Sequence, residues 1–431
     1  MSRGLRREIG LLGLTAYGVG TILGAGIYAL IGSAAGIAGN SVWMSFLLGA
    51  FISSFTGLTY AELSSMIPKS AAEYSYAKAA FKNDLAPFLI GWLIIFTGTV
   101  STSTVALGFG GYFKGLFGAP IVFASTILIV LLSTLNFMGI EESSRLNISF
   151  TITEAAGLLL IVALGIPFLG RVNYLETASG LQGILRASTV IFFAYLGFED
   201  IANLVEETKD PERNIPKALI LSVVMTTLIY VFVAVSVVSL ADWQELGASC
   251  CPLAYAASKS LGQSAFLVMS VIALFATSNT VLILLIVTSR MIYGLAREGA
   301  LPSSFSRISK RRGTPWVAII TAMALAASFV LLGNIEFVAG ITNFGTFITF
   351  ASVNLSAIWL RYRKPEWKRP FKTPMTIGKL PLIPLFGLLS CGLMVTQFQT
   401  DVIALSVFIM FIGIMTQRIL TKTKAKSEKE G

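Results

Sequence analysis

The sequence predicts an all-α, polytopic membrane protein with twelve transmembrane helices and an inverted repeat of five helices. Three observations lead to this prediction: an apolar composition, twelve apolar stretches long enough to span a bilayer, and glycine interruptions in two of them. Of the 431 residues, 55% are hydrophobic and 13% are charged. A soluble chain carries about 25% charged residues, so the composition leaves no room for a large water-soluble domain.

A helix that crosses the bilayer needs about 20 consecutive apolar residues, and stretches of this kind recur along the whole chain. Helices satisfy their own backbone hydrogen bonds, so a helical bundle is the compact arrangement expected for such segments in lipid. The predicted spans are 9–37, 42–66, 87–113, 119–139, 148–169, 184–206, 216–240, 262–289, 315–333, 337–360, 381–398 and 401–419.

The positive charges predict the orientation of these spans. An even number of spans places both termini on one side. If that side is the cytoplasm, 28 of the 32 Lys and Arg residues face it, and the exceptions are Lys114, Arg171, Arg186 and Lys259. This asymmetry is typical of a multi-pass protein of the cytoplasmic membrane with cytoplasmic termini. It also explains the net charge of +10 without a nucleic-acid partner.

The spans divide the chain into five segments. Residues 1–8 form a cytoplasmic N-terminal tail, 9–170 the first repeat, 183–360 the second repeat, 380–420 the last two spans, and 421–431 a basic cytoplasmic tail. We expect this tail, TKTKAKSEKEG, to be disordered, and either solvated or in contact with anionic lipid.

Two of the spans are interrupted. The first span contains GVGTILGAGIYA at 18–29, with four glycines, and each glycine in a helix interior costs roughly 1 kcal/mol relative to alanine. The sixth span contains IFFAYLGFEDIANLVEE at 191–207, where Gly197 precedes Glu199 and Asp200. Charged residues at membrane depth usually line a cavity or face a partner. Interrupted helices at matching positions of two five-helix halves indicate an inverted-repeat transporter with a binding site at the membrane midplane.

The chemistry of an unwound helix favours a zwitterionic ligand. The start of the second half-helix offers N–H groups and a positive dipole end, which suit a carboxylate. The end of the first half-helix offers carbonyl groups, which suit an ammonium group or a cation. An α-amino acid carries both groups. The alternative for the first span is close helix packing through small residues.

The residue inventory excludes several kinds of function. The chain has no histidine, which removes Ser-His catalysis and His-based metal or proton-relay sites. The three cysteines, Cys250, Cys251 and Cys391, are too few and too unevenly spaced for a disulfide framework or a zinc site. The chain lacks the phosphate loop of a primary pump. We therefore expect no enzyme activity, no cofactor and no metal site. A channel and an amino-acid-sensing membrane protein remain as alternatives to a carrier.

Four segments resemble one family of transporters. GVGTILGAGIY, TYAELSSMIPKSAAEYSYAKAAF, FFAYLGFEDIANLVEETKDPERNIPKAL and SRMIYGLAREGALP occur in the order they have in the amino acid–polyamine–organocation (APC) superfamily, over residues 8–360. The chain is thus similar to an amino acid permease. The resemblance implies the LeuT-type 5+5 inverted repeat with broken helices 1 and 6 plus two peripheral helices. It also implies secondary transport of amino acids or related amines.

The resemblance also implies the site residues. Backbone N–H groups of Gly24, Ala25 and Gly26 would hold the substrate carboxylate. Carbonyl groups near Ile22 and at the second break would hold the α-ammonium group. The residues implied at the second break are Phe193, Ala194, Leu196 and Gly197. The aromatic side chains of Tyr195 and Phe198 beside them are candidate gates. A packing role is equally plausible for Phe192 and Phe198.

Coupling to an ion has two candidate sites. Glu154, a charge inside the fifth span, suits a proton carrier, although some proton-coupled members of the family have lysine at this position. Its alternative role is a structural partner of Arg145 or of a polar neighbour. Thr277 and Ser278 in the eighth span suit a sodium site, or they cap helix carbonyl groups. We favour proton-coupled symport or exchange and retain a sodium-coupled symporter as the alternative.

Charges near the inner surface leave substrate and gating open. Glu199 would favour a cationic amino acid or polyamine if it faced the substrate, and otherwise would serve gating or packing; we favour a neutral amino acid. Two loop segments that act near the inner gate in the family carry the charged residues Glu62, Lys69, Glu206, Glu207 and Arg213. From charge alone, these residues could also form ordinary surface ion pairs. The sequence leaves the oligomeric state open.

Overall fold

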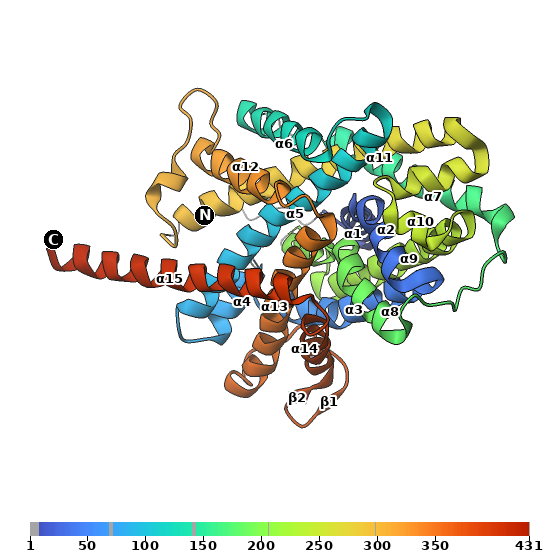
Figure 1. Ribbon diagram of the computed structural model, residues 1–431. Coiled ribbons are helices and arrows are strands. Elements are labelled where there is room, and N and C mark those ends of the chain that lie inside the picture. Colours follow the sequence, from blue (N-terminus) through green and yellow to red (C-terminus); the bar gives the residue numbers. More distant parts are fainter. Residues whose placement is uncertain (1–7, 69–71, 140–143, 206, 298, 431) are drawn as a thin grey trace.

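The computed structural model of the chain describes residues 8–68, 72–139, 144–205, 207–297 and 299–430, and it is almost entirely helical (Figure 1). The α-helices are α1 (Leu11–Ile22), α2 (Gly26–Ala38), α3 (Val42–Met66), α4 (Ala72–Ala80), α5 (Leu85–Phe117), α6 (Ile121–Met138), α7 (Ser144–Gly165), α8 (Gly180–Ile191), α9 (Pro211–Leu240), α10 (Trp243–Ala248), α11 (Pro252–Arg297), α12 (Trp316–Val330), α13 (Ile335–Arg363), α14 (Leu382–Val395) and α15 (Thr400–Glu430). A two-stranded antiparallel hairpin, β1 (Thr376–Ile377) and β2 (Leu380–Pro381), lies between α13 and α14.

Every predicted span overlaps a helix. Among the described residues, eight helical stretches are long and apolar enough to cross a membrane, and α1, α12 and α14 are shorter apolar helices. These helices make the chain a multi-pass membrane protein. The eight stretches are Gly26–Met66, Leu85–Phe117, Ile121–Met138, Phe150–Phe168, Pro211–Leu240, Pro252–Arg297, Ile335–Arg363 and Thr400–Thr421.

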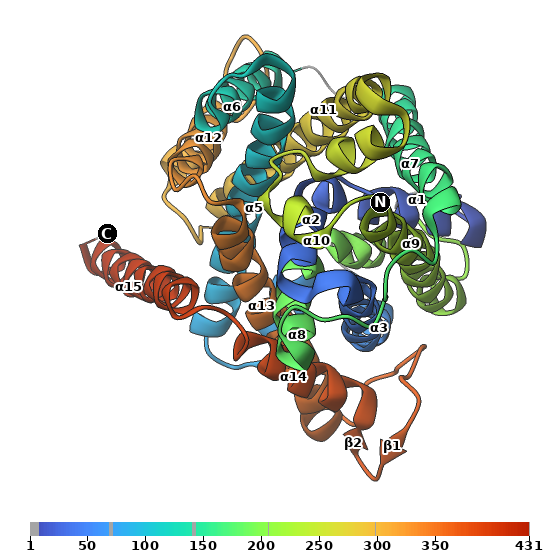
Figure 2. The same cartoon turned by 45° about the vertical axis from the view of Figure 1, so that its right-hand side comes forward.

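The long helix α5 runs through the middle of the bundle. It packs against α11 and α13 and also contacts α6 and α12, as both views show (Figures 1 and 2). Small residues on α5 allow this close packing, because a Cβ on Gly98 would lie 2.6 Å from the hydroxyl oxygen of Thr288 on α11. Small residues at helix contacts are typical of membrane bundles, where backbones approach closely. A second group forms around α3 and α9, and α1 packs on α9.

Both glycine interruptions are present. Helix α1 ends at Ile22 and α2 begins at Gly26, so the first predicted span consists of two separate helices. Helix α8 ends at Ile191 and is followed by two 3₁₀ segments, η3 (Phe192–Tyr195) and η4 (Phe198–Leu204). Gly197 between them has φ of 110°, in the left-handed region that favours glycine.

The end of the chain differs from the prediction. The expectation of a disordered tail at 421–431 is wrong for residues 421–430, because α15 continues as a helix to Glu430. The tail contains Lys, Ala and Glu, which are good helix formers, and neither Gly nor Pro before Gly431. Extending an existing helix also avoids the cost of nucleation. In both views α15 projects away from the other helices (Figures 1 and 2).

Candidate functional site

The two interrupted segments meet at their breaks. A Cβ on Gly26, the first residue of α2, would lie 2.8 Å from the Cα of Ala194 in η3. A Cβ on Gly197 would lie 2.8 Å from the carbonyl oxygen of Thr21 near the end of α1. The Thr21 hydroxyl also donates a hydrogen bond to Gly197 O at 3.2 Å. The two backbones therefore touch at two points, and both points require glycine.

A tyrosine on α9 joins the two breaks. The hydroxyl oxygen of Tyr230 lies 2.7 Å from the carbonyl oxygen of Ile22 and 2.9 Å from that of Ala194. A phenol has one hydrogen to donate, so it satisfies one of these carbonyl groups at a time. The other carbonyl keeps an unused acceptor toward a further donor. Sequence reasoning identified both carbonyl groups but missed Tyr230, although the only tyrosine of its span needs a polar partner when it is buried.

The start of α2 faces α11. The N–H of Ala25, which precedes α2, donates to the Thr280 hydroxyl at 3.3 Å, and that hydroxyl in turn donates to Ala276 O at 3.1 Å. The N–H of Gly24 bonds to Ile22 O at 2.7 Å. The N-cap residue Ala25 makes no capping hydrogen bond with its own side chain. The first N–H groups of a helix have no partner within it, so an uncapped helix start is a place where an anion can bind. Thr280 was not predicted.

At the second break, some backbone groups form hydrogen bonds within the break itself. The N–H of Leu196 donates to Phe193 O at 3.3 Å. The Glu199 carboxylate accepts a hydrogen bond from the N–H of Gly197 at 2.9 Å, which turns this side chain back onto the break. Ala194 O, in contrast, points to Tyr230. Of the predicted carbonyl groups, Ile22 O and Ala194 O therefore converge on one point, and Phe193 O does not join them.

Aromatic rings close around this break. The Phe192 ring lies 4.5 Å from that of Phe347, and the Phe198 ring lies 5.4 Å from that of Phe350, measured between centroids. Both Phe192 and Phe198 are fully buried. The Tyr195 hydroxyl donates a hydrogen bond to Phe46 O at 2.9 Å. All three rings are packed and held in this structure.

Glu154 lies at a junction of three helices. It is buried on α7, and the amide nitrogen of Asn279 on α11 is 3.5 Å from its Oε1. The hydroxyl of Tyr28, in the first turn of α2, donates to the backbone oxygen of Glu154 at 2.6 Å. The structure thus brings Glu154 next to the helix that starts at the first break. The side chain of Arg145, its alternative partner, is outside the described residues.

The two hydroxyls considered for sodium have different surroundings. Thr277 is fully buried and donates to Ala273 O at 2.7 Å, within its own helix. Ser278 is half-buried. The α11 hydroxyl that reaches the first break is that of Thr280, one turn from Thr277 along the helix.

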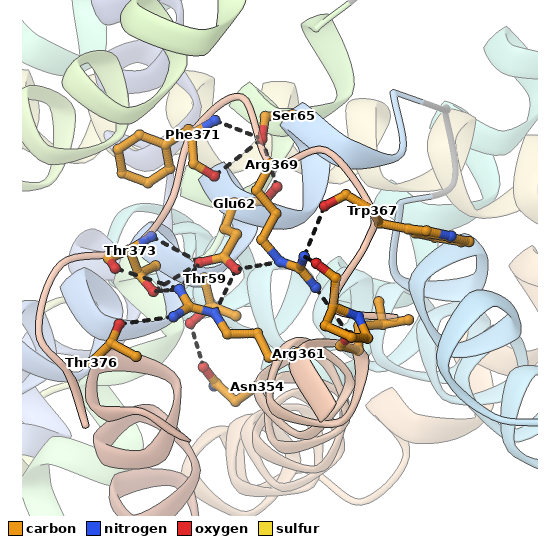
Figure 3. A network of polar contacts seen from close by, with 12 residues as sticks. Thr59, Glu62, Ser65, Asn354, Arg361, Trp367, Arg369, Phe371, Thr373 and Thr376 are labelled. Carbon is orange, nitrogen blue, oxygen red and sulfur yellow. Dashed lines mark hydrogen bonds and ion pairs between the residues drawn. The ribbon is translucent and has the colours of Figure 1, made fainter. Parts of the chain in front are cut away.

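A buried ion pair ties the C-terminal part of α3 to the C-terminal part of α13 (Figure 3). The guanidinium of Arg361 donates to both carboxylate oxygens of Glu62, at 2.9 and 2.5 Å, and Glu62 is 1% exposed. The N–H and hydroxyl of Thr373 each donate to Glu62 Oε2 at 2.8 Å. Burial lowers the pKa of the nearby Arg369 guanidinium, and the charge of Glu62 opposes this shift. The surface-pair interpretation is therefore wrong for Glu62.

The other charges predicted near the gate lie on neighbouring segments. The backbone oxygen of Glu207 accepts hydrogen bonds from the N–H groups of Glu8 and Ile9, which attaches the start of the described chain to the segment after η4. Arg213 is in the first turn of α9. Lys69 and Glu206 are outside the described residues.

Comparisons with known proteins agree with this architecture. The family model described as amino acid permease matches residues 9–418. The chain is 27% identical to the branched-chain amino acid permease BcaP of Bacillus subtilis (strain 168), over 98% of this chain and 95% of that protein. It is 29% identical to the methylthioribose transporter of the same organism, over 90% of this chain and 87% of that protein. It is 28% identical to the vacuolar cationic amino acid transporter 4 of Arabidopsis thaliana, over 84% of this chain and 64% of that protein.

The family model therefore covers nearly all of the chain, including both helix breaks and the buried ion pair. The names of these relatives describe transport rather than a chemical reaction. This multi-pass membrane chain belongs to the amino acid permease family of the APC superfamily.

Proposed function

We propose that the chain is a secondary transporter that moves a neutral α-amino acid across the cytoplasmic membrane by alternating access. The observation that carries this proposal is the convergence at the two breaks. The uncapped start of α2 and the two carbonyl groups at Tyr230 lie on the same crossing segments. One end suits a carboxylate, and the other suits an ammonium group.

The bound amino acid would use backbone groups. Its carboxylate would lie at the N–H groups of Gly24, Ala25 and Gly26, with Thr280 beside them. Its ammonium group would donate to whichever of Ile22 O and Ala194 O the Tyr230 hydroxyl leaves free. Phe193, Leu196, Gly197 and Glu199 would form the wall around it. Backbone recognition of this kind serves any α-amino acid, so the side-chain pocket would set selectivity.

A neutral substrate is favoured by the position of Glu199. Its carboxylate already accepts a hydrogen bond from Gly197 N–H, so attracting a cationic side chain would compete with a bond that stabilises the break. The relatives are named for branched-chain amino acids, methylthioribose and cationic amino acids. A cationic amino acid or polyamine exchanger is therefore the alternative.

The packing of the helices supports a 5+5 inverted repeat within a bundle of twelve spans. Taking α1–α2, α3, α5, α6 and α7 as one half, and α8–η4, α9, α11, α12 and α13 as the other, the most extensive contacts of one half have counterparts in the other. Helix α3 packs on its equivalent α9, α5 on α11, and α6 on α12. The contact of α1 with α9 corresponds to that of α8 with α3, and α5 with α13 corresponds to α11 with α7. Helices α14 and α15 have no counterpart and would be peripheral. Both termini would be cytoplasmic.

We further propose that protons drive the transport or that the carrier exchanges amino acids, with Glu154 as the coupling group. Glu154 contacts Tyr28 in the first turn of α2 through its backbone oxygen and Asn279 on α11 through its carboxyl group. Protonation of this carboxyl would alter the contact with Asn279 close to the start of α2. The sodium alternative has less support, since Thr277 donates to its own helix.

The experiment is transport by the purified chain in liposomes loaded with unlabelled amino acids. Saturable counterflow of a labelled neutral amino acid is expected, with faster uptake under an inward proton gradient and no effect of replacing sodium by choline. Glu154→Gln should abolish the gradient effect and retain exchange. Glu245→Gln, a change of an exposed carboxylate, is the matched control. Uptake that does not saturate and shows no counterflow would indicate a channel instead.

A further inference from the structure

An apolar groove opens between α6, α12 and the segment that leads into α12. In Figure 1 this segment, drawn in orange, runs beside α12 close to α6. The groove has a volume of about 540 Å³, within the range of ligand sites. Its walls are mainly Phe137 from α6, Ile308 from the segment, and Trp316, Ile319, Ile320 and Met323 from α12.

The rim of this groove is strongly basic. Lys310 lines it, and Arg307, Arg311 and Arg312 lie in the same segment, all four exposed. Residues 301–316 contain neither Asp nor Glu. Within the described part of the chain, no carboxylate lies within ion-pair distance of these four side chains. Among the described residues, these exposed cations therefore present a positive rim beside the apolar walls.

The basic segment is held in place against α6. The Arg312 guanidinium donates to Met138 O at 3.3 Å, and the Thr314 hydroxyl donates to Phe137 O at 3.0 Å. Within the segment, Ser309 N–H donates to Thr314 O at 2.9 Å, and Gly313 N–H donates to Ser309 O at 2.9 Å. The charged rim and the apolar walls are thus fixed relative to each other.

A polar group also points into the groove from α6. Ser133 lines it one helical turn from Phe137, and the side chain is 2% exposed. Its hydroxyl has no hydrogen-bond partner among the described residues. A buried hydroxyl without a partner is costly, so a ligand with an acceptor at this depth would stabilise the site.

We propose that this groove binds one anionic phospholipid of the membrane. The lipid phosphate would lie at Lys310 and Arg311, an acyl chain would follow Ile320 and Met323, and an ester oxygen would accept from Ser133. Only an amphiphile uses both the charged rim and the apolar walls. Basic pockets between helices at the cytoplasmic surface suit such headgroups. The inference depends on membrane location and not on which substrate is carried.

The test is native mass spectrometry of the full chain from nanodiscs of phosphatidylcholine with a small fraction of phosphatidylglycerol. One phosphatidylglycerol should remain bound, with at least about tenfold preference over phosphatidylcholine, given two basic groups at the phosphate. Lys310→Gln/Arg311→Gln/Arg312→Gln should lose it. Ser133→Leu and Ile320→Trp, which fill the groove from two sides, should lose it as well. The matched charge control is Lys368→Gln/Lys372→Gln/Lys379→Gln, three exposed lysines on the loop after α13.

Four outcomes would overturn the proposal. Equal retention of phosphatidylcholine would indicate ordinary surrounding lipid. Equal loss in the control variant would indicate general attraction of the basic surface for anionic lipid. Retention in both groove-filling variants, each with an unchanged melting temperature, would place the lipid elsewhere. Displacement of the lipid by inorganic phosphate would show that the rim alone binds.

Discussion

The hydroxyl of Tyr230 lies 2.7 Å from the carbonyl oxygen of Ile22, where the first helix of the chain ends inside the bundle. The same hydroxyl reaches Ala194 O in the second break. This one side chain on α9 therefore supports two backbone groups that have left their helices. Because it can donate to only one of them at a time, it prepares a position for a second donor, which we assign to the substrate ammonium group.

Removal of this hydroxyl should weaken substrate binding. In Tyr230→Phe, one hydrogen bond to a buried carbonyl is lost, and a bond of this kind contributes about 0.5–1.5 kcal/mol. We expect KM for amino acid uptake to rise by up to about tenfold. Tyr255→Phe, which removes an exposed hydroxyl bonded to Glu245, is the control and should leave KM unchanged. An unchanged KM in Tyr230→Phe would remove Tyr230 from the site.

The ion pair of Glu62 and Arg361 should contribute strongly to stability. Both side chains are at least nine-tenths buried, and removal of one partner of a buried pair costs about 3–5 kcal/mol because the other charge is left unpaired. Glu62→Ala and Arg361→Ala should each lower the melting temperature of the detergent-solubilised protein markedly. The exposed pair of Glu245 and Lys259 provides the control, and Lys259→Ala should leave the melting temperature unchanged. If Lys259→Ala lowered the melting temperature as much as Glu62→Ala and Arg361→Ala do, this result would contradict a buried network.

The loop between α10 and α11 offers a test of orientation and of pH dependence. A hydrogen bond with the Cys251 thiol, together with the charge of Lys114, lowers the pKa of Cys250 to about 6. The thiolate is the reactive form, so labelling of Cys250 by a maleimide should be fast at neutral pH and fall to half near pH 6. An unperturbed thiol would titrate near 8.5. Mass spectrometry of the labelled protein across pH 5–9 would measure this.

The same thiol should react from outside the cell. In sealed right-side-out vesicles a membrane-impermeant maleimide should label Cys250, and Cys251 and Cys391, which are both buried, should stay unmodified. Labelling only in inside-out vesicles would reverse the proposed orientation of the termini. A midpoint near pH 8.5 would leave the orientation intact and contradict the pKa.

Local patterns predicted more of this structure than distant contacts did. Gly26 and Gly197 could be recognised because glycine within an apolar span is unfavourable wherever it occurs, and both breaks are present. The partners of the breaks could not be recognised. Tyr230 and Ile22 are 208 residues apart, and Thr280 and Ala25 are 255 residues apart. Only the packed bundle brings these pairs together.

The same limit explains two errors near the inner surface. Glu62 resembled a surface charge because Arg361, its partner, is 299 residues further along the chain. The disordered tail was expected from its charge alone, whereas a preceding helix and good helix formers extend α15 to Glu430. Charge in a membrane protein therefore does not by itself indicate exposure or disorder.

The central claim is that the substrate binds where the two breaks cross, and the most direct measurement is binding of a labelled neutral amino acid to the purified protein. Gly26→Ala would place a Cβ 2.8 Å from the backbone of Ala194, and it should abolish saturable binding. Gly13→Ala on α1, where the nearest neighbouring atom is an ordinary 3.6 Å away, should bind like the parent. Parent-like binding in a folded Gly26→Ala protein would contradict the account.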